Sequence, residues 1–563
     1  MGVLEPIFAI RTEDDLGVGD TDGARQMIDW CHRHRLNVFQ TLPINETGHD
    51  NSPYNAISSL ALEPSTIATT PRRLPDLPAV RFKELARPTL LAELRAGSVK
   101  YPRVKALKHA LLEAAFDHFF KTHFSRDTAR AKEFHAFIKQ HSTWLVDYAL
   151  FRVLMGENGD SPAWDRWPKE HQKPAVARAW LARLPRPRRE ELQRRQLFFE
   201  YVQWIAFSQW EEVHAHANAR GVYLMGDVPF GVSRYSADTW ANPAIFNLDW
   251  SGGAPPETNF KVDLFTEKWG QNWGIPIYRW DVLRKRNFDW WRTRIGTLCE
   301  VFHFFRIDHV LGFFRVYSFP WPPHRNAEFT HLTWEEAGAK TGGHYPGFKP
   351  FPDDTDEHRA FNQAQGQELL QMVLDAAGEN TVIAEDLGVV PDYVAPTLTR
   401  LGIPGFRIPM FFREHHNHYS DPLQYPLLTI AQPATHDHPP LAAQWAGCWA
   451  NIDAGRDVEY NAWELKHLME FAGVDDEKPP RKLTDHILEA YTRALMQSRS
   501  WIVVFQITDV FGQSDRFNVP GSTADSNWSH RLSHTVRELD RHPHLHQRAR
   551  TFSRLARESG RTA

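Results

Sequence analysis

Cysteine, net charge and long apolar runs are all scarce in this 563-residue sequence. The three cysteines are widely separated, which fits a reducing compartment and argues against a disulfide framework or a thiolate metal site. A formal net charge of −4 excludes a general nucleic-acid or anionic-membrane binder, because neither partner attracts a near-neutral surface. No apolar run approaches the length of a membrane span, and residues 1–20 lack the features of a secretory signal. We therefore expect a cytoplasmic protein that binds neither nucleic acid nor membrane.

Aromatic residues, by contrast, are abundant, with 21 Trp, 36 Phe and 14 Tyr. Most are expected in the core, because aromatic side chains are first of all large and apolar. Some tryptophans nevertheless stand in Gly- and Pro-punctuated sequence that is typical of loops: Trp240, Trp250, Trp269, Trp273 and Trp280. An indole ring matches the apolar face of a sugar as well as it matches a base or a hydrophobic partner. Ligand stacking and ordinary packing both remain open for these five.

Eight short β-rich runs recur along the chain, usually with helical segments between them. Strands are expected near Leu4–Ile10, Asn37–Pro43, Val222–Pro229, Phe302–His309, Thr381–Glu385, Gly405–Met410, Pro426–Ala431 and Trp501–Ile507. Helices are expected at Gly23–Arg35, Asp289–Cys299, Gln367–Ala377 and Asp485–Gln497. Eight strands that alternate with helices predict an α/β fold of the (β/α)8 TIM-barrel type, with residues 1–563 as a single catalytic unit.

Insertions must account for about half of the chain, because a barrel needs roughly 250 residues. We expect a mainly helical insertion subdomain at 64–200 and an active-site loop insertion at 231–276, the latter rich in Gly, Pro, Trp and Asn. Long connections after barrel strands occupy the C-terminal face, where barrel enzymes build their sites. The Arg- and His-rich end from His542 is expected to fray.

Three acidic residues stand near the ends of predicted strands: Asp308, Glu385 and Asp437, on the fourth, fifth and seventh βα units. A barrel brings such positions together at its mouth. Glycosidic cleavage with retention needs two carboxyl groups about 5–5.5 Å apart, one as nucleophile and one as acid/base. The third carboxylate could hold sugar hydroxyls or stabilise an oxocarbenium-like charge.

Arg306 shares one strand face with Asp308, because alternate residues of a strand point the same way. The guanidinium should keep the Asp308 carboxylate ionised and oriented, which suits a nucleophile better than a general acid. Structural alternatives exist for each acid: Asp308 could be only an ion-pair partner, Asp437 a helix cap or metal ligand, and either Glu385 or Asp386 a cap. Only one of the last two can face the barrel mouth.

Short ordered motifs extend along nearly the whole chain. They are Leu16-Gly17-Val18-Gly19-Asp20, Ser52-Pro53-Tyr54, residues 144–151, Gly226-Asp227-Val228-Pro229, residues 236–240, Gly253-Ala254-Pro255-Pro256, residues 270–274, Arg306-Ile307-Asp308-His309, residues 384–388, Thr435-His436-Asp437 and Asn518-Val519-Pro520-Gly521. Together they resemble the amylomaltase (disproportionating enzyme) family of 4-α-glucanotransferases, which is related to the α-amylase clan. The stretches 270–274 and 311–315 are closer to its maltose-using branch, which includes plant cytosolic disproportionating enzyme.

The resemblance implies a role for each acid: Asp308 as nucleophile, Glu385 as acid/base and Asp437 as the carboxylate that holds the distorted sugar. It also implies a set of positions that bind the glucan: Arg306, His436, Asp227, Ser52, Tyr54, Gln271, Trp273 and Asn518. The implied reaction moves α-1,4-linked glucosyl or maltooligosyl units among maltose, maltooligosaccharides or glycogen-like glucans, with no cofactor. An α-glucan hydrolase with the same three acids remains an alternative. A catalytically dead glucan-binding protein would be expected to lack at least one of them.

The sequence departs from the family pattern at three places. Glu257 stands where the family usually has Asp, and the loop 257–269 is longer than usual, which leaves the acceptor open. His438-Pro439-Pro440 replaces the usual Asn-containing run, and Tyr235 replaces an Asp found in many relatives. The first strand is expected almost at Met1, so we expect no N-terminal starch-binding module. The preferred donor and the oligomeric state stay open.

Histidines form two local clusters, His415, His416 and His418, and His542, His544 and His546. Neither cluster has an acidic or cysteine partner at a fixed sequence spacing. Loop histidines without such partners are more often solvated than metal-bound. We therefore expect no metal.

Overall fold

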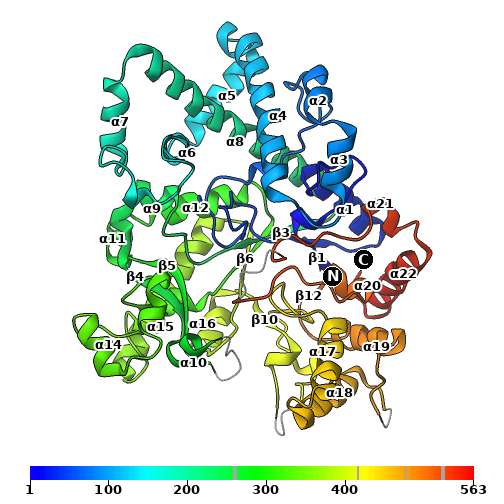
Figure 1. Ribbon diagram of the computed structural model, residues 1–563. Helices are drawn as coiled ribbons and strands as arrows, with labels where there is room; N and C mark the ends of the chain where they lie inside the picture. The colour runs from blue at the N-terminus through cyan, green and yellow to red at the C-terminus, as the bar shows by residue number, and fades with distance from the viewer. Residues whose placement is uncertain (258–262, 415–417, 476–477, 522–525, 563) are drawn as a thin grey trace.

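The computed structural model describes residues 1–257, 263–414, 418–475, 478–521 and 526–562 (Figure 1). Eight parallel strands form one sheet in the order β10-β11-β12-β1-β2-β3-β6-β9. The two ends of this order are joined where the Ala384 N–H donates to the Pro404 carbonyl at 2.8 Å, which closes a barrel. The strands are β1 Gly2–Leu4, β2 Val38–Gln40, β3 Tyr223–Val228, β6 Phe304–Ile307, β9 Thr381–Ala384, β10 Gly405–Arg407, β11 Thr429–Ala431 and β12 Ile502–Gln506. The expected TIM barrel is confirmed.

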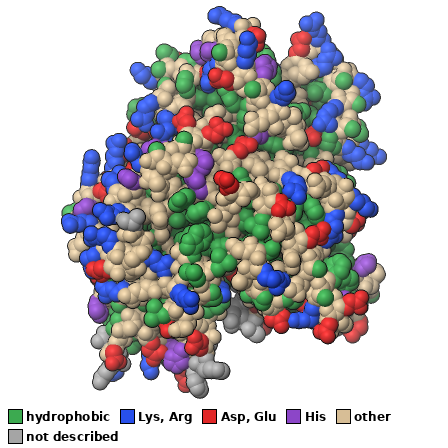
Figure 2. Space-filling view, turned by 180° about the vertical axis from the view of Figure 1, so that it is seen from behind, with side chains coloured by type: hydrophobic (Ala, Val, Ile, Leu, Met, Phe, Trp, Pro, Cys, Tyr) green, Lys and Arg blue, Asp and Glu red, His purple; other side chains and the backbone are tan. Residues whose placement is uncertain are grey.

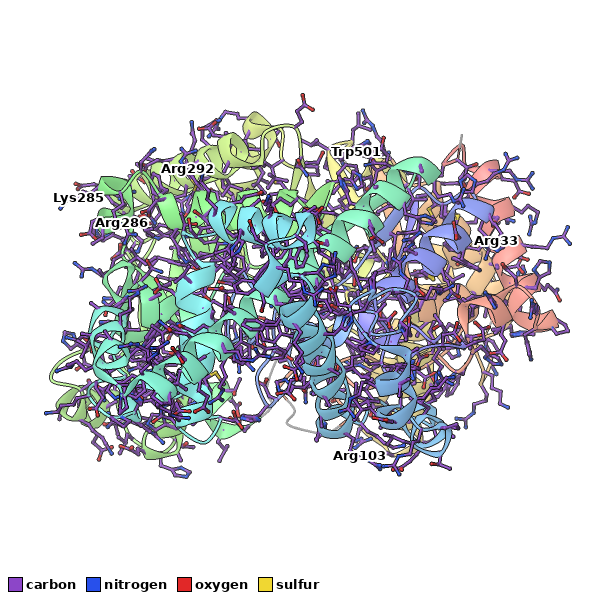
Figure 3. All side chains as sticks on the ribbon, turned by 90° about the horizontal axis from the view of Figure 1, so that it is seen from above. Arg33, Arg103, Lys285, Arg286, Arg292 and Trp501 are labelled. Carbon is purple, nitrogen blue, oxygen red and sulfur yellow. The ribbon has the colours of Figure 1, made fainter. Side chains whose placement is uncertain are left out.

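Alternation along the strands fills the barrel interior with apolar side chains. One buried cluster contains Leu4, Val38, Met225, Ile383, Phe406, Ile408, Ile430, Ile502 and Val504. At the N-terminal end of the barrel, Phe304 stacks on Tyr223 with ring centroids 5.0 Å apart and also contacts Trp501 at 5.9 Å. Trp501 lies at the outer edge of the molecule in Figure 3, with 44% of its surface exposed. The polar residues of these strands, such as Asp227 and Arg306, lie toward the opposite, C-terminal end of the barrel.

The first strand is shorter than the expected Leu4–Ile10. It ends at Leu4, and Ile7–Ala9 form a single 3-10 turn instead. Pro6 precedes this turn with φ −63° and has no N–H to continue a ladder. The expected strand is therefore wrong after residue 4, because proline ended the pairing.

All four expected helices are present, but the one expected at Gln367–Ala377 begins much earlier, at Asp356. They are α1 Thr21–Arg33, α12 Asp289–Cys299, α15 Asp356–Ala377 and α19 Asp485–Met496. The other helices around the barrel are α13 Leu311–Phe314, α16 Val394–Leu401, α20 Ile507–Phe511, α21 Val536–Leu539 and α22 Pro543–Glu558. The expectation that the chain frays from His542 is wrong, because α22 buries Leu545, Phe552 and Leu555 against the core.

The sequence between β2 and β3 is mainly helical from Ala79 onward, and these helices stand to one side of the barrel (Figure 1). Its helices are α2 Ala79–Leu85, α3 Pro88–Arg95, α4 Tyr101–Thr122, α5 Ala129–Gln140, α6 Leu145–Glu157, α7 Pro174–Arg183 and α8 Arg186–Arg220. The expected end of this insertion at residue 200 falls inside α8. That helix continues along α1 and is capped by Gly221. The φ of Gly221 is +65°, a left-handed conformation that glycine adopts with little strain because it has no Cβ.

The segment 231–276 holds more regular structure than the loop that the sequence suggested. Strands β4 Phe246–Ala254 and β5 Gln271–Tyr278 pair with β7 Val316–Phe319 and β8 Gly347–Lys349 in an antiparallel sheet of order β5-β4-β7-β8. Register shifts within the β4–β5 pair interrupt the alternation of polar and apolar residues from which strands are predicted. The short helices of this region are α9 Ala237–Ala241, α10 Leu264–Trp269, α11 Trp280–Lys285 and α14 Trp334–Lys340.

Packing explains two of the five loop tryptophans. Trp240 and Trp269 are 1% and 0% exposed and belong to hydrophobic clusters. Trp273, on β5, is 38% exposed and is therefore free to contact a ligand.

A further helical group follows β11: α17 Leu441–Asp453, α18 Val458–Ala472 and α19. These helices share a separate apolar cluster that includes Trp445, Leu465, Leu468 and Tyr491. In the described part of the chain, no helix has the length and apolar content needed to cross a membrane. The face shown in Figure 2 carries basic and acidic side chains interspersed, and Arg33, Arg103 and Lys285 lie at the periphery in Figure 3.

Candidate active site

The barrel register places Asp227 of β3 directly beside Arg306 of β6. The Arg306 guanidinium donates two parallel hydrogen bonds to this carboxylate, from Nε to Oδ1 at 3.0 Å and from Nη2 to Oδ2 at 2.7 Å. Both side chains are almost fully buried. A bidentate, charge-assisted pair of this kind fixes the orientation of the guanidinium.

The same Arg306 nitrogen reaches two further groups. Nη2 donates to Asp308 Oδ1 at 2.8 Å and lies 3.3 Å from the Tyr54 hydroxyl, which itself donates to Asp227 Oδ2 at 2.5 Å. One buried cation is thus shared by two carboxylates and a phenol. Asp308, whose side chain is 30% exposed, is the member of this network that opens toward the mouth.

The pKa of Asp308 is raised to about 6, chiefly by burial. The charge of Arg306 works in the opposite direction, while the carboxylates of Asp227 and Asp437 raise the pKa further. The sequence alone suggested that Arg306 holds the pKa of Asp308 low, but this pKa is raised. Arg306 limits the rise, so that Asp308 remains mostly ionised at neutral pH.

Glu385 follows β9 and continues the inward face of Ile383. Its Oε2 accepts a hydrogen bond from the His309 backbone N–H at 2.7 Å. Burial, followed by the nearby charge of Asp308, raises the pKa of Glu385 to about 8. The neighbouring Asp386 is instead used structurally, because its Oδ1 accepts the Phe406 N–H at 2.6 Å. Of the two adjacent acids, Glu385 is the one that faces Asp308.

Asp437 lies beyond the end of β11 and carries its own set of donors. Asn518 Nδ2 donates to Oδ1 at 2.6 Å, and His436 Nε2 lies 3.3 Å from Oδ2. Burial alone would raise the pKa of Asp437, but the His436 charge and the hydrogen bonds from His436 and Asn518 outweigh it and hold this pKa well below its usual range. Asp437 is therefore an ionised acceptor.

Aromatic stacking joins the Asp437 group to the Arg306 network. The His436 ring lies parallel to Tyr54 with centroids 5.1 Å apart, and Trp528 packs against both rings at 5.9 and 5.8 Å. Ser52 acts one step away, because its hydroxyl accepts the Tyr54 N–H at 3.3 Å within a tight turn. The 52–54 motif therefore positions the Tyr54 hydroxyl.

A cavity of about 240 Å³ opens on the Glu385 side of the carboxylates. Gln271 and Trp273 line it, and Trp273 Nε1 donates to Gln271 Oε1 at 3.2 Å. Glu257 also lines it, and burial raises the pKa of this carboxyl. Glu257 is the first residue of the lengthened loop expected at 257–269. Residues 258–262 of that loop lie outside the described residues.

All eleven predicted site residues thus lie around one barrel mouth, although Ser52 reaches it only through Tyr54. The sequence reasoning missed several neighbours: His309, Phe411, Arg516 and Trp528. His309 has a φ of +48° and turns the chain so that its N–H meets Glu385. Arg516 donates to the Asp437 carbonyl at 2.8 Å, a backbone contact that leaves no side-chain pattern to find.

His438, noted as a departure from the family, also borders the cavity. Its Nδ1 lies 2.7 Å from the Thr435 hydroxyl, and its ring meets Phe411 edge to face. Burial lowers its pKa to about 4, so the imidazole is neutral at pH 7. Within the described ranges, metal-ligand spacing occurs at His418, His467 and Glu470, on and beside α18, and not among the three carboxylates.

A closed eight-stranded barrel with carboxylates after its strands is an arrangement that enzymes acting on glycosidic bonds use. Over residues 5–536 the chain matches the family described as 4-alpha-glucanotransferase, and it belongs to that family. The resemblance seen in the motifs is confirmed. Its closer relation to the maltose-using branch stays a prediction.

Individual relatives agree with this assignment. A 4-alpha-glucanotransferase of Chlamydia caviae is 28% identical over 96% of this chain and 92% of the relative. One of Thermus thermophilus is 30% identical over 90% of each. The solved amylomaltase of Streptococcus agalactiae in complex with acarbose superposes with a TM-score of 0.76 at 22% identity, covering 100% of this chain and 99% of that one. This last likeness shows the shared fold.

Proposed function

We propose that this enzyme transfers α-1,4-linked glucosyl or maltooligosyl units between glucans by a retaining double displacement. The observation that carries the proposal is the placement of two carboxyl groups at one barrel mouth: Asp308 lies 2.8 Å from the Arg306 guanidinium, and Glu385 accepts the N–H of the residue after Asp308. In this setting the pKa of Asp308 is raised to about 6 and that of Glu385 to about 8. Near pH 7, Asp308 is therefore mostly a carboxylate and Glu385 mostly an acid. Retaining glycosyl transfer requires this division between a nucleophile and a proton donor.

In the first step, an Asp308 oxygen attacks C1 of the donor sugar while the bond from C1 to the departing O4 breaks. Glu385 gives its proton to that oxygen, and a β-linked glycosyl ester remains on Asp308. In the second step, the 4-hydroxyl of an acceptor sugar attacks C1, and the now ionised Glu385 takes the hydroxyl proton. The ester bond breaks, Asp308 leaves as a carboxylate, and the α linkage is restored.

The surrounding residues have supporting roles in this proposal. Arg306, held by Asp227 and Tyr54, orients the nucleophile through the 2.8 Å contact with Asp308. Asp437, kept ionised by His436 and Asn518, accepts hydroxyls of the distorted sugar and offsets its positive charge. Gln271 and Trp273 line the cavity beside Glu385, where the acceptor is expected.

Transfer requires that a glucan, and not water, reaches the glycosyl ester. The half-exposed Trp273 offers a flat apolar surface for a sugar ring, and the neutral His438 adds little charge that would attract water. We expect maltose, maltooligosaccharides or glycogen-like glucans as substrates, because the family and its relatives are named 4-alpha-glucanotransferases. No cofactor takes part in the proposed steps.

Incubation with maltotriose tests the proposal. Transfer yields glucans both longer and shorter than the substrate, with newly formed linkages that are all α by nuclear magnetic resonance. Glucose and maltose as sole products would instead identify an α-glucan hydrolase. The Asp308→Ala enzyme should form no products while it retains its fold by circular dichroism, and activity in this variant would refute the nucleophile assignment.

A further inference from the structure

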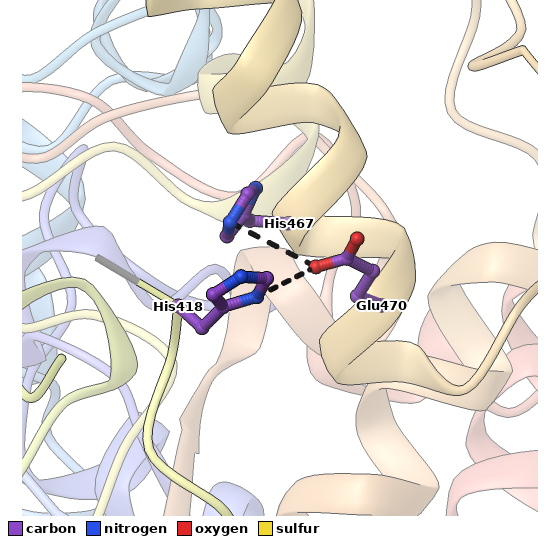
Figure 4. Close-up of side chains that lie close together, drawn as sticks. All are labelled: His418, His467 and Glu470. Atoms are coloured by element: carbon purple, nitrogen blue, oxygen red, sulfur yellow. Dashed lines mark hydrogen bonds and ion pairs between the residues drawn. The ribbon is translucent and has the colours of Figure 1, made fainter. Parts of the chain in front are cut away.

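Three potential metal ligands meet outside the catalytic mouth, on α18 and the hairpin before it (Figure 4). His467 and Glu470 lie one turn apart on α18, and His418 comes from the hairpin that begins at Phe412. One ligand atom of each residue lies within 4.8 Å of the others. His418 Nδ1 is 3.0 Å from Glu470 Oε2, and His467 Nε2 is 3.8 Å from the same oxygen.

His467 is arranged as a metal-binding imidazole commonly is. Its Nδ1 lies 2.9 Å from the Trp463 carbonyl, which can only accept, so this nitrogen carries the proton. The lone pair is therefore on Nε2. That atom is buried, has no hydrogen-bond partner among the residues that the structure describes, and faces the other two ligands in a residue that is 3% exposed. A second hydrogen bond that fixes the tautomer of a ligating histidine is typical of zinc sites.

The spacing suits a small tetrahedral ion. Ligand atoms bound at about 2.0–2.2 Å around Zn²⁺ would lie roughly 3.3 Å from one another. The distances from Glu470 Oε2 to His418 Nδ1 and His467 Nε2, 3.0 and 3.8 Å, bracket that separation, so only small side-chain shifts are required. Two imidazoles and one carboxylate also form a donor set that favours Zn²⁺ over Ca²⁺ or Mg²⁺, which prefer oxygen ligands.

The hairpin is already attached to α18 beside these residues. Glu464, one turn before His467, accepts hydrogen bonds from Arg413 at 3.0 Å and from the Tyr419 hydroxyl. Arg413 and Tyr419 pair with each other across the hairpin. These contacts hold the backbone of His418 beside the turn of α18 that carries His467 and Glu470 before any ion binds. Less conformational entropy is therefore lost on binding.

We propose that His418, His467 and Glu470 bind one divalent transition-metal ion of the Zn²⁺ type, which clamps the hairpin to α18. On binding, the ion takes the place of the His418 Nδ1 proton, which moves to Nε2 or to solvent, and water completes the coordination. The hairpin starts directly after Phe411, which lines the catalytic cavity and contacts His438. The clamp is therefore a brace for one wall of the cavity and takes no part in bond cleavage.

The sequence expectation of no metal considered His418 only with its sequence neighbours. Its proposed partners lie about fifty residues further along the chain, and His415 and His416 fall outside the described residues. Folding, and not sequence spacing, brings the three ligands together.

The test uses untagged full-length protein that has been treated with a chelator and dialysed. Equilibrium dialysis against Zn²⁺ should give one bound equivalent, and Co²⁺ should give the visible absorption of a tetrahedral complex. His418→Ala, at an exposed position, should weaken Zn²⁺ binding at least about tenfold, since even changes beside a metal ligand typically cost 10–100-fold. His544→Ala, at another exposed histidine, is the matched control and should bind like the native chain.

Two results would overturn the proposal. The first is a native chain that binds no stoichiometric Zn²⁺, and the second is a His418→Ala variant that binds Zn²⁺ as tightly as the His544→Ala control. Glu470→Gln gives an independent check, because loss of the charged ligand should also weaken binding while the exposed site tolerates the amide. None of these measurements depends on glucan transfer, so their outcome is separate from that of the proposed function.

Discussion

The Glu385 carboxylate accepts the backbone N–H of His309 at 2.7 Å, and His309 is the residue directly after Asp308. The proposed proton donor is thus attached to the loop that carries the proposed nucleophile. The left-handed turn at His309, with φ +48°, aims this N–H at Glu385. This hydrogen bond therefore ties the Glu385 carboxyl group to the backbone directly after Asp308.

The rate of transfer should depend on pH as a bell-shaped curve. As pH rises through about 6, Asp308 loses its proton and becomes nucleophilic, so kcat/KM increases. As pH rises through about 8, Glu385 loses the proton that the leaving oxygen needs, so kcat/KM falls. Initial rates with maltotriose between pH 4 and 10 would check both limbs. A flat profile between pH 5 and 9 would contradict the assignment of the two roles.

The Asp227→Asn substitution should move only the acidic limb. Asp227 raises the pKa of Asp308 through its negative charge, so removal of that charge should lower this pKa and shift the limb to lower pH. The amide remains close in shape and can still accept one hydrogen bond from Arg306. Asp392→Asn, at a side chain that is 79% exposed, is the control and should leave the profile unchanged. A shift of the alkaline limb instead would indicate that Asp227 acts on Glu385.

The sequence predicted the inner face of the barrel well. Alternation along one strand was enough to place Arg306 beside Asp308. It left Glu385 and Asp386 as alternatives, of which the resemblance favoured Glu385, and Asp386 proves to accept the Phe406 N–H. The eight strands were found because each lies in a short β-rich run, usually with a helical segment before the next run. Their ends were less accurate, since Pro6 stopped β1 early.

Contacts between distant segments could not be predicted in the same way. The pairing of Asp227 with Arg306 depends on the register between β3 and β6, which no single strand reveals. The irregular β4–β5 pair hid its own alternation. The pKa of Asp308 depends on how deeply folding buries it, a quantity that the sequence does not contain.

The free energy of unfolding should depend on pH because Glu385 is buried. Its pKa in the folded chain, about 8, lies above its usual value of 4.5, so the folded state binds more protons between these pH values. This contribution to stability is complete below about pH 4.5 and is lost as pH rises through about 8. The Glu385→Gln side chain cannot ionise. The melting temperature of this variant minus that of the native chain should therefore increase as pH rises from 5 to 9. Scanning calorimetry would measure the difference, and a constant difference would contradict the raised pKa.

Loss of the Asn518 amide should impair the sugar-binding carboxylate. Asn518 donates to Asp437 at 2.6 Å, and a hydrogen bond to a charged group is worth about 1.5–3 kcal/mol. Asn518→Ala should therefore lower kcat/KM by roughly 10- to 100-fold and raise the pKa of Asp437. Asn527→Ala, in the same loop region, is a suitable control because its amide exchanges hydrogen bonds with the Val519 backbone. Equal losses in both variants would indicate a general loop effect and not a specific one.

The fate of the glycosyl ester should depend on Trp273. This indole is 38% exposed, lines the cavity beside Glu385 and meets His309 edge to face at 4.9 Å. Trp273→Ala should remove the apolar platform for the acceptor and admit water, so the ratio of transfer to hydrolysis should fall several-fold while donor cleavage continues. Trp334→Ala provides the control, because Trp334 is similarly exposed but packs on Trp269 in the second sheet's cluster. Chromatography of maltotriose products, with glucose quantified separately from longer glucans, would measure the ratio. An unchanged ratio in Trp273→Ala would show that acceptor selection lies elsewhere, and Glu257 on the same cavity wall would then be the next position to replace.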